Sequence, residues 1–346
     1  MIYFNCDYNE GAHEKIMERL AQTNMEQTEG YGCDTYCRQA RELILEKCQS
    51  KDAAVHFLVG GTQTNATVIA AALRTHQGVL AAQTAHINAH ETGAIEAVGH
   101  KVLTLMSGNG KLTAEQVEEY YQAHISDDSF EHIVQPKMVY ISQPTELGTL
   151  YTLAELEALS SVCRKNNLYL FVDGARLGYG LTAADNDVML PDLARLSDVF
   201  YIGGTKVGAL FGEAVVIMNP AIQEDFRYVI KQHGGMLAKG RLLGIQFLTL
   251  FEDDLYLKIS EYANELAERI REVLYRKQIP FLVENRTNQI FPILPDEALA
   301  KLGEKYCYTY QQRMDAGHSA VRFCTSWATK KSAVEALCAD LREILA

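Results

Sequence analysis

Short apolar runs alternate with longer amphipathic stretches over residues 53–220. The runs end in glycine or charged residues, a pattern typical of buried strands bounded by turns, and they include AAVHFLVGG (53–61), KVLTLM (101–106) and LYLFVD (168–173). The stretches between them have helical spacing, as in 62–76, 113–124 and 152–167. This alternation predicts an α/β fold of three layers, in which helices cover both faces of a mainly parallel sheet.

The pattern changes after about residue 245. Residues 254–278 have the spacing of one long amphipathic helix, and 330–345 of a closing helix. Between them, PFLVE (280–284), NQIFPIL (288–294) and SAVRFCTSW (319–327) predict strands. We therefore expect a large domain over 1–245, which begins with an N-terminal arm of about residues 1–24, and a smaller α+β domain over 246–346. A chain of 346 residues accords with two lobes, because single cores stop growing near roughly 250–300 residues.

Composition narrows the function classes. The formal net charge is −12 and no basic tract is present, so nucleic acid is not an expected partner. No run approaches the ~18 apolar residues that a membrane helix needs, and the first residues, MIYFNCDYNE, lack the features of a secretory signal. Eight cysteines include no CxxC pair, and Cys33 and Cys37 have no second pair to complete a metal site. We expect a cytoplasmic protein with reduced thiols and no bound metal.

Two apolar runs end in polar side chains that carry chemistry. LYLFVDGARLGYG (168–180) presents Asp173 and Arg176 just after its strand, and DVFYIGGTKVGALFG (198–212) presents Lys206 after the next one. Asp173 and Lys206 are 33 positions apart, which leaves room for one crossover unit. Because ligands bind at the carboxyl ends of parallel strands, we expect these three side chains at one edge of one sheet.

The turn VGGTQTN (59–65) places glycines between a strand and a strong helix. Unpaired N–H groups and the dipole of a helix N-terminus bind phosphate, and glycine permits close approach, so Gly61 and Thr62 are candidate phosphate contacts. An ordinary strand-to-helix turn gives the same pattern. The Walker and GxGxxG fingerprints are absent, which argues against a nucleotide-dependent dehydrogenase.

His86 and Arg322 each have two interpretations. His86 follows a strand end, where its ring could stack on a flat cofactor or serve only as a structural side chain. His86 and His90 are four residues apart, but HExxH and a third ligand are absent, so a metal site is not expected. Arg322 lies inside an apolar strand and should meet a carboxylate, either of the protein or of a ligand.

Together these pieces match what pyridoxal phosphate requires: a lysine for a covalent bond, a carboxylate for the pyridine nitrogen, a helix N-terminus for phosphate and an arginine for the carboxylate of an amino acid. The segments VGGTQTN, TAHINAHETGA (84–94), VDGARLG (172–178) and TKVGALFG (205–212), with Arg322, give the chain a clear likeness. It resembles the L-threonine aldolases, which belong to the β-eliminating lyase group of fold-type-I pyridoxal phosphate enzymes with an aspartate-aminotransferase-like fold. The segments span nearly the whole chain in the family's order.

The resemblance implies roles for the cofactor contacts. Lys206 would bind the cofactor covalently, with Thr205 beside it. Asp173 would pair with the pyridine nitrogen, and Gly61 and Thr62 would hold the phosphate.

It also implies substrate and subunit contacts. Arg176 would reach the cofactor's phenolic oxygen and the substrate carboxylate, which Arg322 would also bind. His86 would stack on the ring and take a proton from the substrate's β-hydroxyl. Such enzymes are homodimers or homotetramers with shared sites, in which Tyr31 would approach the neighbour's site and Lys239 its phosphate.

Three segments depart from the family pattern. Asn5-Cys6-Asp7 stands where Arg-Ser-Asp is common, so Cys6 would replace a serine at the substrate carboxylate. The loop Ser142–Gly148 lacks the family's histidine and has Glu146 near that place. Around the lysine, Thr-Lys-Val-Gly-Ala replaces Ser-Lys-Gly-Leu-Gly. These changes bear on substrate choice more than on fold or cofactor.

The expected activity is therefore cleavage of the Cα–Cβ bond of L-threonine, L-allo-threonine or a related β-hydroxy-α-amino acid, which gives glycine and an aldehyde. The same side chains are compatible with β-elimination to pyruvate and ammonia, or with amine transfer to a keto acid. A non-enzymatic binding protein of this fold is a further alternative, but it would not need Lys206, Asp173 and both arginines.

Overall fold

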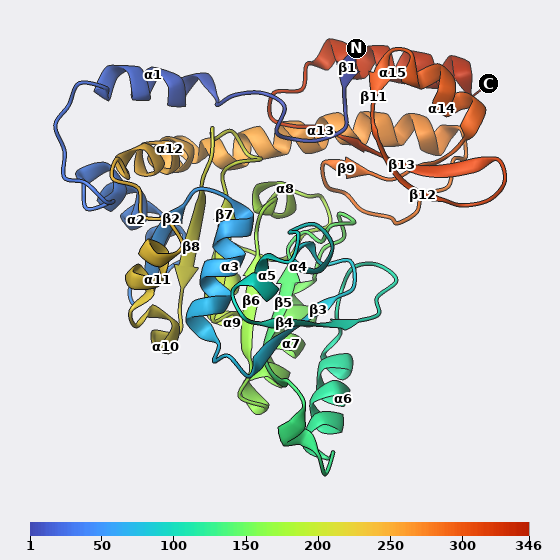
Figure 1. The fold of residues 1–346 in the computed structure, drawn as a ribbon. Coiled ribbons are helices and arrows are strands. Elements are labelled where there is room, and N and C mark those ends of the chain that lie inside the picture. The colour runs from blue at the N-terminus through green and yellow to red at the C-terminus, as the bar shows by residue number, and fades with distance from the viewer. Residues whose placement is uncertain (346) are drawn as a thin grey trace.

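The computed structural model describes residues 1–345 and confirms the predicted α/β fold (Figure 1). A seven-stranded sheet has the order β2-β8-β7-β6-β5-β3-β4. The strands are β2 (Ala54–Leu58), β3 (Gln77–Ala82), β4 (Lys101–Leu105), β5 (Gln135–Ser142), β6 (Tyr169–Asp173), β7 (Val199–Gly203) and β8 (Glu213–Ile217).

The sheet is mainly parallel, as predicted, and β8 is the exception. β8 runs antiparallel to both of its neighbours, β2 and β7. Gly203 and Glu213 face each other in the ladder, so the segment between them is a hairpin loop, too short for the crossover that a parallel pair needs. As a result, the carboxyl ends of β2, β5, β6 and β7 and the start of β8 meet at one edge.

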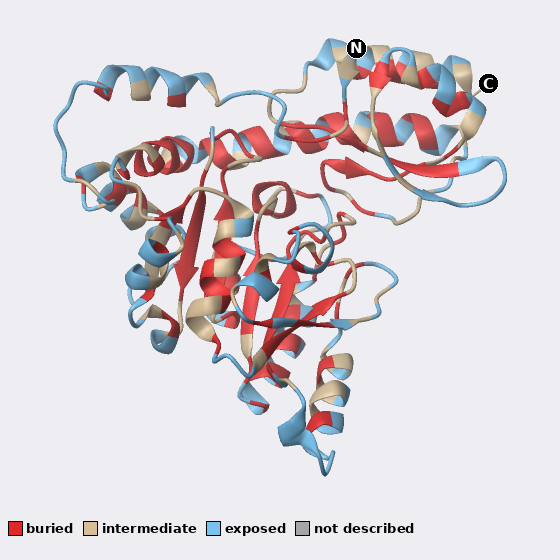
Figure 2. Ribbon diagram, in the orientation of Figure 1, coloured by how far each residue is buried: buried red, intermediate tan, exposed pale blue. Residues whose placement is uncertain are grey.

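Helices cover both faces of this sheet and give the predicted three layers. One face packs on α3 (Gly61–Ala72), α4 (His86–Ala89), α5 (Ala94–Ala97), α10 (Pro220–Gln223) and α11 (Phe226–Gln232). The other packs on α2 (Thr35–Lys47), α6 (Ala114–Ile125), α7 (Leu153–Lys165), α8 (Leu177–Leu181), α9 (Leu190–Leu196) and α12 (Arg241–Phe251), with α1 (Glu14–Thr23) against α12. Both strand faces are therefore buried, as Figure 2 shows.

The C-terminal part forms a separate small sheet beside a long helix. Its elements are α13 (Leu255–Arg276), β9 (Gln289–Ile290), β10 (Ile293–Pro295), α14 (Asp296–Gly303), β11 (Tyr306–Cys307), β12 (Thr309–Arg313), β13 (His318–Cys324) and α15 (Lys331–Ile344). β1 (Ile2–Tyr3) pairs with β11, and Phe4 is buried in the core of this part. The first residues thus lie against the last 100, and both termini lie there (Figure 1). A domain boundary near residue 245 stays a prediction.

Two details of the small sheet differ from the prediction. PFLVE is not a strand: only Phe281 makes an isolated bridge, to Pro292. β11 and β12 were not predicted, because β12 is a half-exposed polar segment, TYQQR, whose pattern carries no apolar signal.

Three further features concern chemistry. All eight cysteines are free thiols. Within residues 1–345, no group of three His, Cys, Asp or Glu side chains is placed to hold a metal ion. No helix in this part of the chain is long and apolar enough to cross a membrane.

Candidate active site

Asp173 lies at the carboxyl end of β6 and accepts hydrogen bonds on both oxygens. Tyr201 Oη donates to Oδ1 at 2.6 Å, as does the Ala175 N–H at 2.9 Å. Oδ2 accepts from the Tyr140 hydroxyl and from Asn65 Nδ2 at 3.2 Å. Burial and the Asp173 charge raise the pKa of both phenols well above the usual range, so they remain neutral donors. The neighbouring strands β5 and β7 thereby fix the carboxylate in place.

A hydrogen-bonded chain joins Asp173 to His86. Asn65, near the start of α3, also donates to Glu91 Oε1 at 2.7 Å. The same oxygen is 2.8 Å from His86 Nδ1. An ionised carboxylate only accepts, so the proton of the neutral imidazole resides on Nδ1. The lone pair of Nε2 is then the one available to accept a proton.

Glu146 lies directly beside His86. Its Oε1 accepts from the backbone N–H of His86 at 2.9 Å and from Ser142 Oγ at 2.7 Å. Burial raises the pKa of this carboxyl group. A second carboxyl group thus contacts His86, through its backbone N–H.

Lys206 lies in the loop between β7 and β8, near a buried ion pair. Arg176 donates to Asp7 from Nε at 2.7 Å and from Nη2 at 3.0 Å, and Asn288 Nδ2 donates to Asp7 at 3.0 Å. Burial and the Arg176 charge lower the pKa of Lys206, while Asp7 and Asp173 oppose that shift. A lowered pKa favours the neutral amine, which is the nucleophilic form.

Thr205 and Glu213 make a second contact in this loop. Thr205 Oγ1 donates to Glu213 Oε1 at 2.8 Å, and the Gly204 N–H donates to Oε2 at 3.2 Å. Burial raises the pKa of Glu213 to about 8. The hydroxyl beside the lysine is therefore already engaged by a carboxylate.

Arg322 lies on β13 and meets neutral oxygens. Nη1 donates to Gln289 Oε1 at 3.0 Å, and Nη2 to the Asn5 carbonyl at 2.8 Å. Nε is buried with no partner among residues 1–345. Burial lowers the pKa of His90, and His86 and the Arg322 charge lower it further. The ring centre of His90 is 5.7 Å from that of His86. No carboxylate in the described chain forms an ion pair with Arg322, so its charge is available to an anion.

This arrangement agrees with what comparison to known proteins shows. A model of the family described as beta-eliminating lyase matches residues 6–296. The chain belongs to the beta-eliminating lyase family. It is 31% identical over 354 aligned positions to the low specificity L-threonine aldolase of Pseudomonas sp. strain NCIMB 10558, with 99% of this chain and 97% of that protein covered. It is also 29% identical to the enzyme of that name from Pseudomonas aeruginosa, with 99% and 97% covered.

Solved structures give the same result. A threonine aldolase of Leishmania major superposes with a TM-score of 0.97 at 43% identity, with 100% of each chain covered. A histidinol-phosphate aminotransferase of Clostridium acetobutylicum, at 13% identity and a TM-score of 0.74, shares the fold. The resemblance to the threonine aldolases is confirmed.

The beta-eliminating lyase site has side chains that fit pyridoxal phosphate. Asp173 is a buried carboxylate, and Lys206 is a half-buried amine whose pKa burial lowers. Gly60 precedes α3 without a side-chain cap, so the N–H groups at Gly61 and Thr62 lack a side-chain acceptor. A Cβ on Gly61 would lie 3.2 Å from Tyr201 Oη, so a larger residue would crowd this turn. The site thus has groups suited to bind an anion, to pair with a ring nitrogen and to form a covalent bond.

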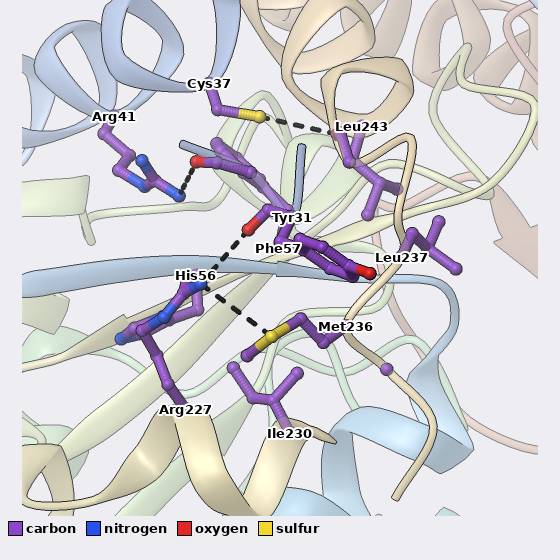
Figure 3. A pocket seen from close by; sticks show the side chains of 13 residues that line it. Tyr31, Cys37, Arg41, His56, Phe57, Arg227, Ile230, Met236, Leu237 and Leu243 are labelled. Carbon is purple, nitrogen blue, oxygen red and sulfur yellow. Dashed lines mark hydrogen bonds between the residues drawn. The ribbon is translucent and has the colours of Figure 1, made fainter. Parts of the chain in front are cut away.

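Two residues predicted for a subunit interface lie together in another part of this family member. The Tyr31 N–H donates to the Ala238 carbonyl at 3.1 Å, next to the exposed Lys239. Figure 3 shows Tyr31 lining a pocket with Arg227, which donates to the Tyr31 carbonyl at 3.2 Å. The Tyr31 ring is 48% exposed, and Lys231 lies over it. Cys6, by contrast, is buried next to Asp7, and its thiol donates to Asn9 Oδ1 at 3.1 Å.

Several polar residues of the site were not predicted. Asn65 is inside the VGGTQTN segment and Glu91 is five residues after His86, so both were near recognised motifs. Asp7 is next to Cys6 in the N-terminal segment that was compared with the family pattern. The others lie in apolar strands, where nothing in the local pattern marks them: Tyr140, Tyr201 and Glu213.

Proposed function

We propose that this protein is a pyridoxal-phosphate-dependent aldolase that cleaves the Cα–Cβ bond of L-threonine, L-allo-threonine or a related β-hydroxy-α-amino acid. The observation that carries the proposal is the convergence of Lys206, Asp173 and His86 at one sheet edge, with Asn65 and Glu91 as the hydrogen-bonded link. The relatives named L-threonine aldolase support the choice of reaction.

Five residues would hold the cofactor. Lys206 would be its covalent anchor, and Asp173 would pair with its pyridine nitrogen. Gly61 and Thr62 at the start of α3 would bind the phosphate, and Thr205 would add a hydroxyl beside the lysine. When bound, the cofactor ring stabilises the negative charge left on the substrate's α-carbon after bond cleavage.

Two arginines and a thiol face the substrate carboxylate in this proposal. Asp7 holds Arg176 by Nε and Nη2, which leaves Nη1 free to donate to the carboxylate or to the cofactor's phenolic oxygen. Arg322 brings a second positive charge that has no protein carboxylate within the described residues. Cys6 lies beside them but donates more weakly than a serine would.

His86 is the residue that accepts the proton of the β-hydroxyl. Glu91 holds its Nδ1, so Nε2 receives the proton as the Cα–Cβ bond breaks and the β-carbon leaves as an aldehyde. The imidazole ring would also stack on the cofactor. Glu146 holds the backbone of His86, and its raised pKa suits it to take up this proton in turn. A proton added to the α-carbon completes glycine.

The assembly is proposed to be a homodimer or homotetramer in the cytoplasm. Tyr31 and Lys239 are adjacent and exposed, which is the disposition that a contact with a neighbouring subunit's substrate and phosphate requires.

Product analysis tests the function. Purified protein with pyridoxal phosphate is given L-threonine, L-allo-threonine and a panel of β-hydroxy amino acids, and glycine, acetaldehyde, pyruvate and ammonia are measured. We expect equal amounts of glycine and aldehyde, and no turnover by Lys206→Ala. A 2-oxo acid with ammonia, 2-oxobutyrate from threonine or pyruvate from serine, would instead establish β-elimination, and stable amine transfer to a keto acid an aminotransferase.

A further inference from the structure

Glu213 is a buried carboxylate at the sheet edge that the proposed mechanism does not use. Its side chain is 3% exposed. In the ladders it lies opposite Leu58 of β2 and Gly203 of β7. Leu58 and Val215, two residues further along β8, pack in the core that includes α3. Since strand side chains alternate between faces, Glu213 points to the same face as α3, at the edge where α3 begins.

The carboxylate has neutral donors only. Thr205 Oγ1 and the Gly204 N–H bond to its two oxygens, and no lysine or arginine of residues 1–345 forms an ion pair with it. The charged groups that face it are Lys206, which favours its ionisation, and Asp173, which opposes it. The phenols that face it, Tyr201 and Tyr256, are neutral because burial raises their pKa.

A phosphate at the start of α3 conflicts with this arrangement in two ways. It adds negative charge at the sheet edge where Glu213 is already buried. It also needs hydroxyl donors, but the single proton of Thr205 is committed to Glu213, while its oxygen accepts from the Gly212 N–H at 3.1 Å. Both conflicts disappear when the Glu213 carboxyl is neutral.

We propose that Glu213 is neutral whenever the cofactor's phosphate is bound, so that it takes up one proton from solvent where it is ionised in the free protein, and that this leaves the Thr205 hydroxyl free to donate to the phosphate. The inference rests on the proposed cofactor but concerns a residue outside the aldolase chemistry. It makes Glu213 a positioning residue, which couples cofactor binding to a protonation step.

The pH dependence follows from the sign of this coupling. Burial raises the pKa of Glu213 to about 8, so above that pH the free protein holds an ionised carboxylate that must be neutralised on binding. Cofactor affinity therefore falls as pH rises above about 8, by up to tenfold per pH unit. Below that pH the carboxyl is already neutral and no uptake is needed.

Calorimetry of cofactor binding tests the proposal without turnover. Pyridoxamine phosphate is used because it has the phosphate but no aldehyde, so it leaves Lys206 unmodified. Titrations of apoprotein at pH 9, in buffers with different ionisation enthalpies, give the number of protons taken up. We expect about one proton more for wild type than for Glu213→Gln, and a steeper loss of affinity between pH 8 and pH 9.

The outcomes separate failure of this inference from failure of the proposed cofactor. Equal proton uptake by wild type and Glu213→Gln overturns the inference and leaves the proposed function intact. If Glu213→Gln does not fold, Glu213→Ser removes the same carboxyl with a smaller side chain and is held to the same comparison. Failure of wild type to bind pyridoxamine phosphate or pyridoxal phosphate would overturn the proposed cofactor and this inference together.

Discussion

Arg176 and Asp7 form a two-point ion pair, 2.7 Å and 3.0 Å long, although 169 residues separate them in sequence. The pair ties the N-terminal segment to the loop after β6. It also occupies the edge of the guanidinium formed by Nε and Nη2, so the direction in which the remaining Nη1 donates is fixed. The carboxylate of Asp7 thereby orients Arg176, the proposed contact of the substrate carboxylate.

Asp7→Asn should both destabilise the protein and weaken substrate binding. The change leaves a buried guanidinium without its counter-charge, which costs about 3–5 kcal/mol of unfolding free energy. Denaturant unfolding and steady-state kinetics measure the two effects, and KM should rise more than kcat falls. As a control, Asp315→Asn removes an exposed partner of His318, and its effect on stability should be far smaller because solvent screens that pair. Equal stability of the two variants would contradict the buried pair.

The cost of Asp7→Asn should shrink in acid. Burial opposes ionisation of Asp7, but Arg176 and Lys206 outweigh it and hold its pKa below the unfolded value of 3.8. A depressed pKa contributes stability that is present above about pH 4 and is lost as pH falls through the folded-state pKa. Unfolding free energies of wild type and variant should therefore converge between pH 5 and pH 2. A constant difference in unfolding free energy over that range would show that the ionised Asp7 carboxylate does not stabilise the folded protein.

Tyr201→Phe should weaken cofactor binding. The variant removes the 2.6 Å hydrogen bond to Asp173, and a bond to a charged group contributes about 1.5–3 kcal/mol. We expect the Kd of pyridoxal phosphate, measured by visible absorbance, to rise about tenfold. Tyr151→Phe is the matched control, since Tyr151 is equally buried but bonds to the Leu112 N–H instead. Similar changes in the two variants would refute a specific role for Tyr201.

Glu146→Gln should lower kcat and leave cofactor affinity unchanged. Loss of a proton-accepting group costs about 100-fold or more in rate, whereas the glutamine oxygen can still accept from the His86 N–H. Burial raises the pKa of Glu146, so the wild-type rate should rise with pH through an inflection above 4.5 that the variant lacks.

Ser142→Ala gives an independent check on the same group. The Ser142 hydrogen bond favours the ionised carboxylate, so its removal raises the pKa of Glu146 and should move that inflection to higher pH. An unchanged profile in both variants would remove Glu146 from the reaction.

Sequence reasoning located the residues that end strands. Asp173 and Lys206 follow apolar runs beside glycines, and that contrast can be read from the sequence alone. Asp7 and Glu213 reach their partners only because the chain folds back on itself: Asp7 meets Arg176 across the molecule, and Glu213 meets Thr205 because β8 turns back as a hairpin. Such contacts depend on strand pairing and register, which the local sequence pattern does not encode.

The small sheet shows the same limit in the fold. β13 is apolar and was predicted, whereas β12 exists because it pairs with β13 at a sheet edge where polar residues face solvent. The central sheet was predictable since both of its faces are buried and its strands are continuous apolar runs.

The central claim is that Lys206 and Asp173 belong to one cofactor site, with Lys206 as the covalent anchor. Holoprotein reduced with borohydride fixes the bound pyridoxal phosphate to its lysine, and peptide mass spectrometry then identifies that residue. The account predicts the added mass on Lys206, with no labelled peptide in Lys206→Ala. Modification of another lysine, or the same labelling in Lys206→Ala, would contradict it.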